Sequence, residues 1–115
     1  MQVDTIFLSV NATDWEHQSA WWATLLGRTW DRQPMPSCHE WDLREGVLFQ
    51  VLDNQGEGGP ITVTLLIKDL DIELKRLEAA GISFPAPEPV PGFDTLRYTR
   101  TKDAEGNVVG LLDGA

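Results

Sequence analysis

The stretch that decides the fold is Asp103-Ala104-Glu105-Gly106-Asn107-Val108-Val109-Gly110-Leu111-Leu112. It has the pattern of a polar turn with a glycine followed by an apolar strand, which is typical of a β-hairpin. Upstream of it, a strand over 61–67 runs into a helix over 69–80 that a glycine should end. The same strand, helix and glycine occur once earlier, within 3–27. The sequence therefore predicts an internal repeat.

The first half of the chain is predicted to hold one helix and four strands. Alternating apolar residues predict a strand over 3–10, with Ile6, Leu8 and Val10 on one face. Thr13 and Glu16 have the spacing of a capping box at the start of a helix that Gly27 should end. Three further strands are expected over 28–32, 38–43 and 47–52.

The second half repeats this order after a Gly-rich polar connector. Short strands are expected over 82–84, 96–101 and 108–112, with a proline-rich loop over 85–91. We therefore predict an α+β fold in one domain, 1–115, with module one over about 1–53, a linker over 54–60 and module two over about 61–115. Two paired βαβββ modules would form a curved mixed sheet with a concave pocket. The alternative is a ferredoxin-like α+β domain without a pocket.

Composition and charge exclude several classes of function. The chain has 115 residues, 42% of them apolar, which suits a single globular domain. Its formal charge of -9 would repel phosphate backbones and anionic lipid, so we expect no nucleic-acid or membrane partner. Cys38 is the only cysteine, which excludes an intrachain disulfide and a cysteine-based zinc site. No signal-peptide pattern is visible, and we expect a cytoplasmic protein.

The order and spacing of several short segments resemble the vicinal oxygen chelate superfamily, that is, glyoxalase-like and bleomycin-resistance-like domain proteins. The segments that carry the resemblance cover nearly the whole chain: 5–10 (TIFLSV), 22–27 (WATLLG), 65–69 (LLIKD), 77–81 (LEAAG) and 103–112. Helix one with its tandem tryptophans and the strand around 48–51 are most similar to the glyoxalase-like subgroup.

Metal-containing members of this superfamily use four side chains, one from the first and one from the last strand of each half. The resemblance puts these positions on Thr5, Gln50, Thr62 and Gly110. Threonine is a poor ligand, glutamine a weak neutral one, and glycine has no side chain. We therefore expect no metal and no other cofactor.

Few residues remain for catalysis, and the catalytic residues stay unknown. His39 and Glu40 are adjacent, so they should point to opposite faces of a strand. We interpret His39 as a residue at the surface or edge of a sheet, and His17 as a solvated residue on a helix. No spacing suggests a Ser-His-Asp or Cys-His nucleophile.

The parity of the strands predicts a ligand site on the concave sheet face. If Ile6, Leu8 and Val10 face the helix, their neighbours in sequence must face away from it. The residues expected to line the site are Thr5, Phe7, Leu48, Gln50, Thr62, Thr64, Leu66 and Gly110, and Trp41 and Arg100 are added as candidates from neighbouring strands. Apolar walls with a few hydroxyls suit a neutral or weakly polar organic ligand. Arg100 could instead meet a carboxylate or phosphate, or balance the acidic surface.

The first hypothesis for function is a metal-independent, glyoxalase-like protein that binds a small molecule, such as a metabolite or drug to be sequestered. The alternative is an enzyme of the superfamily, that is, a lyase, isomerase or dioxygenase, or a metal-free enzyme using His39 or Glu40. A third hypothesis is a regulatory module with a vestigial pocket. Because two small modules have a limited core, we also expect a homodimer, with exposed apolar side chains at the contact.

Overall fold

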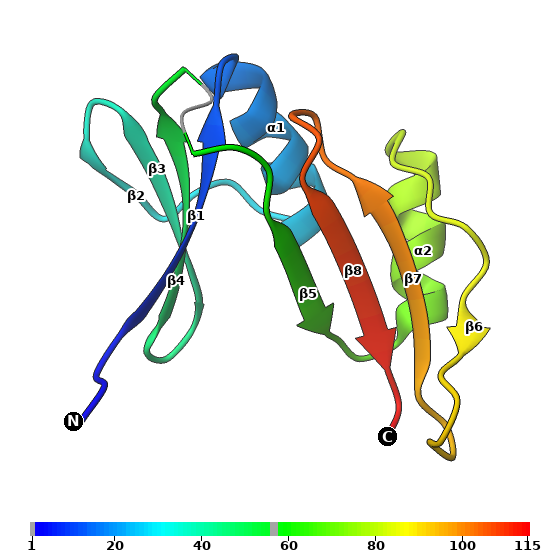
Figure 1. Ribbon diagram of the computed structural model, residues 1–115. Coiled ribbons are helices and arrows are strands. Elements are labelled where there is room, and N and C mark those ends of the chain that lie inside the picture. The colour runs from blue at the N-terminus through cyan, green and yellow to red at the C-terminus, as the bar shows by residue number, and fades with distance from the viewer. Residues whose placement is uncertain (1, 56–57) are drawn as a thin grey trace. The chain divides into compact units, whose positions relative to one another are not determined.

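The computed structural model describes residues 2–55 and 58–115 and divides the chain into two compact units, residues 1–60 and 61–115 (Figure 1). Each unit has one helix and one four-stranded mixed sheet. In the described part of the chain, no helix is long and apolar enough to cross a membrane. The predicted α+β class is confirmed.

Unit 1 has the order strand, helix, strand, strand, strand. Its elements are β1 (Ile6–Ala12), α1 (Trp15–Leu26), β2 (Arg32–Met35), β3 (Cys38–Arg44) and β4 (Val47–Asp53). The sheet order is β1-β4-β3-β2, with β1 parallel to β4 and the other neighbours antiparallel. The first and last strands of the unit are therefore adjacent, although a helix and two strands separate them in sequence.

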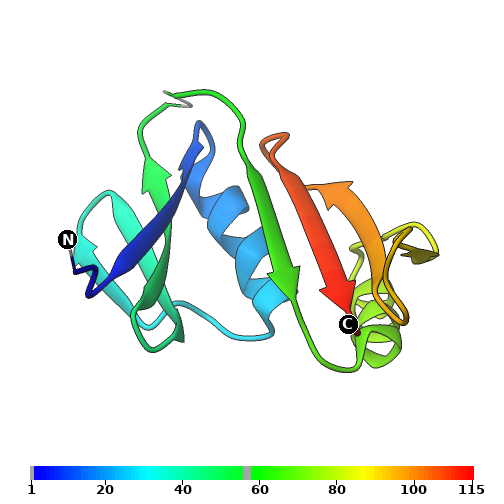
Figure 2. The ribbon, with the colours of Figure 1, turned by 60° about the horizontal axis from the view of Figure 1, so that its bottom comes forward.

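Unit 2 repeats this topology. Its elements are β5 (Thr62–Leu66), α2 (Leu70–Ala79), β6 (Glu88–Pro89), β7 (Arg97–Lys102) and β8 (Val108–Asp113). The sheet order is β5-β8-β7-β6, again with the first strand parallel to the last. Figure 2 shows β8 lying between β5 and β7, as Figure 1 does from another side. The internal repeat predicted from the sequence is thus confirmed.

The predicted alternation of strand faces is also confirmed. In β1, Val10 is buried and Phe7 is 57% exposed; in β5, Val63 is buried and Leu66 is 67% exposed. Each sheet therefore has one face covered by its own helix and an opposite face, which we call the open face. The large buried side chains of the described strands, such as Trp41, Phe49 and Leu111, lie on the covered faces.

Helix α1 begins one residue later than the sequence suggested. Its N-cap is Asp14, not Thr13, and the Asp14 carboxylate accepts from the backbone N–H of His17 at 3.2 Å. It ends at Gly27, whose φ of 79° is left-handed, as predicted. Trp22 lies on its buried face, with its ring centroid 4.2 Å from that of Phe49 in β4. The core of unit 1 is therefore largely aromatic.

The turn between β7 and β8 holds unit 2 together at one end. The Asp103 carboxylate accepts from the backbone N–H groups of Glu105 and Asn107 and from the Asn107 side-chain amide. The Asn107 side-chain oxygen in turn accepts from the backbone N–H of Ile61 at 2.8 Å. One buried Asp-Asn pair thus closes the hairpin and fixes where β5 begins beside β8.

Two predicted strands are wrong in position. The strand expected over 28–32 lies at Arg32–Met35, and the strand expected over 82–84 is absent from the described structure, where β6 falls inside the predicted proline-rich loop. From the sequence, Pro34 is expected between two strands and Pro89 in the proline-rich loop. Both lie in strands at the edge of a sheet, where an absent N–H breaks no ladder bond.

Replacing Trp22 with alanine should destabilise the protein by about 3–5 kcal/mol, because it leaves a cavity against Phe49 in the core. The control is His17→Ala on the exposed face of the same helix, which should cost less than about 0.5 kcal/mol. Chemical denaturation measures both free energies of unfolding. Similar values for the two variants would contradict this orientation of α1.

Candidate functional site

A row of polar side chains crosses the open face of sheet 1. Ser9, Gln50, Glu40 and Arg32 are register partners on β1, β4, β3 and β2, in that order across the sheet. The Ser9 hydroxyl donates to Gln50 Oε1 at 2.8 Å, and Gln50 Nε2 donates to Glu40 Oε1 at 2.8 Å. Arg32 donates to Glu40 Oε2 at 2.6 Å. Every polar side chain in this row therefore already has a partner in the protein.

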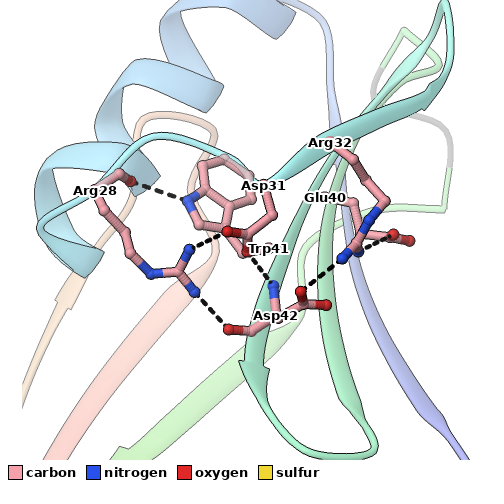
Figure 3. Close-up of polar contacts among 6 residues, drawn as sticks. All are labelled: Arg28, Asp31, Arg32, Glu40, Trp41 and Asp42. Carbon is pink, nitrogen blue, oxygen red and sulfur yellow. Dashed lines mark hydrogen bonds and ion pairs between the residues drawn. The ribbon is translucent and has the colours of Figure 1, made fainter.

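The row continues into the loop between α1 and β2 (Figure 3). Arg32 forms a second ion pair with Asp42 at 2.6 Å, and the backbone N–H of Asp42 donates to Asp31. Arg28 forms an ion pair with Asp31, and this contact holds the pKa of the Asp31 carboxyl below its usual value. The network fixes the loop to β3. We interpret it as structural, because each of its charged side chains has a partner within the protein.

His39 lies in the core, and its predicted position at the surface or edge is wrong. Its ring is stacked between Trp15 and Trp30, with centroid distances of 3.9 and 3.6 Å. Its Nδ1 lies 2.6 Å from the Ser19 hydroxyl. Only 5% of the residue is exposed, and burial lowers the pKa of the imidazole. This environment does not suit a catalytic base that must reach a substrate.

Trp41 does not share a face with Gln50, so it does not belong with the other predicted site residues. It is the register partner of Phe49 on the covered face and has no exposed surface. Its indole N–H donates to the Arg28 carbonyl at 3.0 Å. A strand residue one position from Glu40 necessarily points to the opposite face. Trp41 therefore fills the core.

Sheet 2 carries the equivalent row with different chemistry. Thr64, Gly110 and Arg100 are register partners on β5, β8 and β7. Tyr98, two residues from Arg100, lies across the glycine: a Cβ on Gly110 would stand 2.7 Å from Tyr98 Cε2 and 2.8 Å from its hydroxyl. The space over Gly110 is therefore not open, because the Tyr98 ring occupies it.

The remaining predicted site residues lie on the open faces. Phe7 and Leu48 are register partners next to the polar row of sheet 1, and Thr5 precedes β1. Thr62 and Leu66 lie on the open face of sheet 2. Arg97 is on the covered face of sheet 2, where it forms ion pairs with Asp71 of α2 and Asp113 of β8. Arg100 alone of these two arginines faces outward.

Two hollows lie in unit 2. One, of about 200 Å³, lies beside β7 and is lined by Pro85, Ala86, Glu88, Tyr98, Thr99 and Arg100. The other, of about 500 Å³, lies where β5 and β8 end and is lined by Leu66, Ile67, Lys68, Asp69, Asp113 and Gly114. The first brings together a cationic, an aromatic and a carboxylate side chain. It is the stronger candidate for recognition of a polar ligand.

Comparison with solved structures identifies the fold. A glyoxalase/bleomycin resistance protein from Catenulispora acidiphila is similar to 96% of this chain and 98% of its own, with a TM-score of 0.83 and 23% identity. The chain has the glyoxalase/bleomycin-resistance fold. The resemblance seen in the sequence is thereby confirmed.

Proteins with this fold and different activities are similarly close. Lactoylglutathione lyase from Agrobacterium tumefaciens matches 95% of this chain and 92% of its own, with a TM-score of 0.76 and 16% identity. TnmS3, an antibiotic binding protein from a Streptomyces species, matches 100% and 97%, with a TM-score of 0.76 and 20% identity. No protein-family model and no curated protein matches the chain. The fold alone therefore does not choose between enzyme and binder.

The residues at the four positions where the sequence resemblance puts metal ligands do not fit a metal ion. The Gln50 amide is held by Ser9 and Glu40, and Gly110 offers no donor beneath the Tyr98 ring. Threonine hydroxyls at Thr5 and Thr62 are weak ligands. Among residues 2–55 and 58–115, no three His, Cys, Asp or Glu side chains are grouped so that they could hold a metal ion.

Sequence reasoning missed Tyr98. Its place on the open face follows from period-two alternation with Arg100, so parity along β7 could have found it. That its ring covers Gly110 depends on the register between β7 and β8. Pattern in one strand does not specify this register.

The burial of His39 predicts a pH-dependent stability. Because its pKa is lowered in the folded state, the unfolded chain binds more protons at pH values just below about 6.5, and the free energy of unfolding should fall as the pH drops through that range. His39→Phe keeps a ring between the two tryptophans but cannot be protonated, so it should weaken this dependence. The measurement is denaturant unfolding at a series of pH values.

The control is the exposed histidine, His17. His17→Gln should leave the pH dependence as in the wild type. If His17→Gln flattened the curve and His39→Phe did not, the buried histidine would not be the group responsible.

Proposed function

We propose that this protein binds a small organic molecule without a metal ion and sequesters it, as a metabolite- or drug-binding protein with the glyoxalase/bleomycin-resistance fold. The observation that carries the proposal is the chemistry at the superfamily's metal positions: Gln50 is engaged in a hydrogen-bonded row, and Gly110 has no side chain. What the open face of sheet 2 offers is hydroxyls, an arginine and apolar surface. Such a mixture suits binding and orientation of a ligand.

The fold comparisons support a binding role without requiring one. TnmS3, described as an antibiotic binding protein, has this fold along nearly its whole length. The alternative function, an enzyme, is supported by the similar fold of a lactoylglutathione lyase. Two observations argue against a metal-free enzyme that uses His39 or Glu40. His39 is stacked in the core, and Glu40 is paired with Arg32 and Gln50. We therefore favour the binder.

A thermal-shift screen of metabolites and antibiotics tests this proposal. At least one compound should raise the melting temperature, and a chelator should change neither that shift nor the melting temperature of the free protein, because no metal takes part. Gly110→Leu should abolish the shift, since the new side chain would displace the Tyr98 ring from the open face.

The control for this screen is Ala79→Leu, at an exposed small residue of α2 in the same unit. That variant should bind the compound as the wild type does. Turnover of a compound that a chelator stops would favour the enzyme. A ligand bound equally well by wild type and Gly110→Leu would exclude the open face of sheet 2.

We also propose that the protein forms a homodimer. β1 is an edge strand, and the segment that leads into it exposes apolar side chains: Val3 is 65%, Ile6 51% and Phe7 57% exposed. An apolar, unpaired strand edge favours association.

Sedimentation should therefore give a mass near twice the 12.8 kDa of one chain. Phe7→Asp should shift it toward the monomer. Phe93→Asp, at an aromatic residue with 58% exposure in unit 2, should not. A wild-type protein that sediments as a monomer would contradict the proposal.

A further inference from the structure

The two units have equivalent rows of side chains on their open faces. In only one of these two rows do the polar side chains all have partners within the protein. In unit 1 the row of Ser9, Gln50, Glu40 and Arg32 satisfies every polar side chain internally. In unit 2 the row of Thr64, Gly110 and Arg100 does not. Within the described residues, the Arg100 guanidinium has neither a hydrogen bond nor an ion pair.

Two hydroxyl groups lie close together over Gly110, the register partner of Arg100. The point where a Cβ of Gly110 would stand is 2.8 Å from the Tyr98 hydroxyl and 3.2 Å from Thr64 Oγ1. Neither hydroxyl has a hydrogen-bond partner among the residues that the structure describes. Thr64 and Arg100 are the register partners of Gly110 on either side. The Tyr98 ring therefore fills the space over Gly110 and lies beside Thr64, and Tyr98 and Arg100 both line the hollow beside β7.

The charge on this face has the opposite sign to that of the chain. Arg100 and Lys102 lie two residues apart on β7 and share the open face, while the whole chain carries a net charge of -9. Glu88 is the register partner of Tyr98 on β6, at the far edge of the sheet. An anionic group is thus expected at the Arg100 end of the hollow beside β7.

We infer that the open face of sheet 2 recognises an organic carboxylate, with Arg100 as the charged donor and the Tyr98 hydroxyl as a further donor. This inference rests on the proposed function and names the class of its ligand. It replaces the neutral ligand expected from the sequence. A carboxylate has two acceptor oxygens that match a guanidinium, and charge-assisted hydrogen bonds are stronger than neutral ones.

The size of the hollow limits the probe. Its volume of about 200 Å³ is smaller than a pocket for a drug-sized molecule, so it suits a single ring with its carboxylate, or that part of a larger ligand. Benzoate, benzamide and benzylamine differ in charge and share the ring. They form a matched set of probes.

The test is a titration of the full ¹⁵N-labelled chain with each probe, followed by backbone amide shifts in NMR spectra. Benzoate should shift amides in β7 and β8 near Arg100 and Gly110, and should bind at least about tenfold more tightly than benzamide, as loss of one charge-assisted contact implies. Benzylamine should bind no more tightly than benzamide. Arg100→Gln should remove the preference for benzoate, and Tyr98→Phe should reduce it.

The control is Arg44→Gln, which removes the same charge from another exposed arginine that has no partner in the described structure. It should leave benzoate binding unchanged. Benzoate that binds no better than benzamide, fails to bind at millimolar concentration, or is weakened equally by both arginine variants would overturn the inference. If neutral compounds from the screen bind this face while benzoate does not, the proposed binding function stands and only the carboxylate preference fails.

Discussion

The structure of unit 1 depends on the hydrogen-bonded row that runs from Ser9 through Gln50 and Glu40 to Arg32. Each member comes from a different strand, so the row links all four strands on the face that α1 does not cover. A one-residue slip of a strand would turn its member toward the opposite face, and a slip of β2 or β4 would remove one of the two partners of the buried Glu40. The row therefore specifies the register of the sheet as well as stabilising it.

The same row explains why unit 1 has few polar side chains that could act on a substrate. Gln50 occupies a position where the sequence resemblance puts a metal ligand, yet both ends of its amide are engaged by neighbours. Directly behind it, the covered face is filled by Phe49, Trp41 and the stacked ring of His39. On the open face of sheet 1, the polar side chains of the row have partners. On the covered face, His39 is buried. Among the residues of unit 1 that the structure describes, neither face offers a free catalytic group near Gln50.

Unit 2 uses the same topology and leaves its row open. A glycine takes the place of the amide, and an aromatic ring from the neighbouring strand lies over it. The ring protects the backbone that a glycine would otherwise expose, and it brings a hydroxyl to the same point. The two units thus differ in the polar groups of their open faces. In unit 1 these groups bond to one another, and in unit 2 hydrogen-bond donors remain available.

The sequence by itself determined the repeat, the fold class and the two faces of each strand. Periods of two and 3.6, together with Gly27 and the Asp103–Asn107 turn, are local signals that survive in the folded protein. It misjudged Pro34 and Pro89, because whether a proline is tolerated in a strand depends on whether that strand lies at an edge.

Only the tertiary structure decided what surrounds each side chain. His39 could be predicted to lie opposite Glu40, but not to lie between Trp15 and Trp30, which come from a helix and a loop far away in sequence. Likewise, parity places Arg100 and Gly110 on one face, while the register of β7 against β8 decides that Tyr98 covers the glycine. Local pattern fixes the direction in which a side chain points. Its partners are fixed by which strands pair and in which register, and those contacts are made between residues distant in the chain.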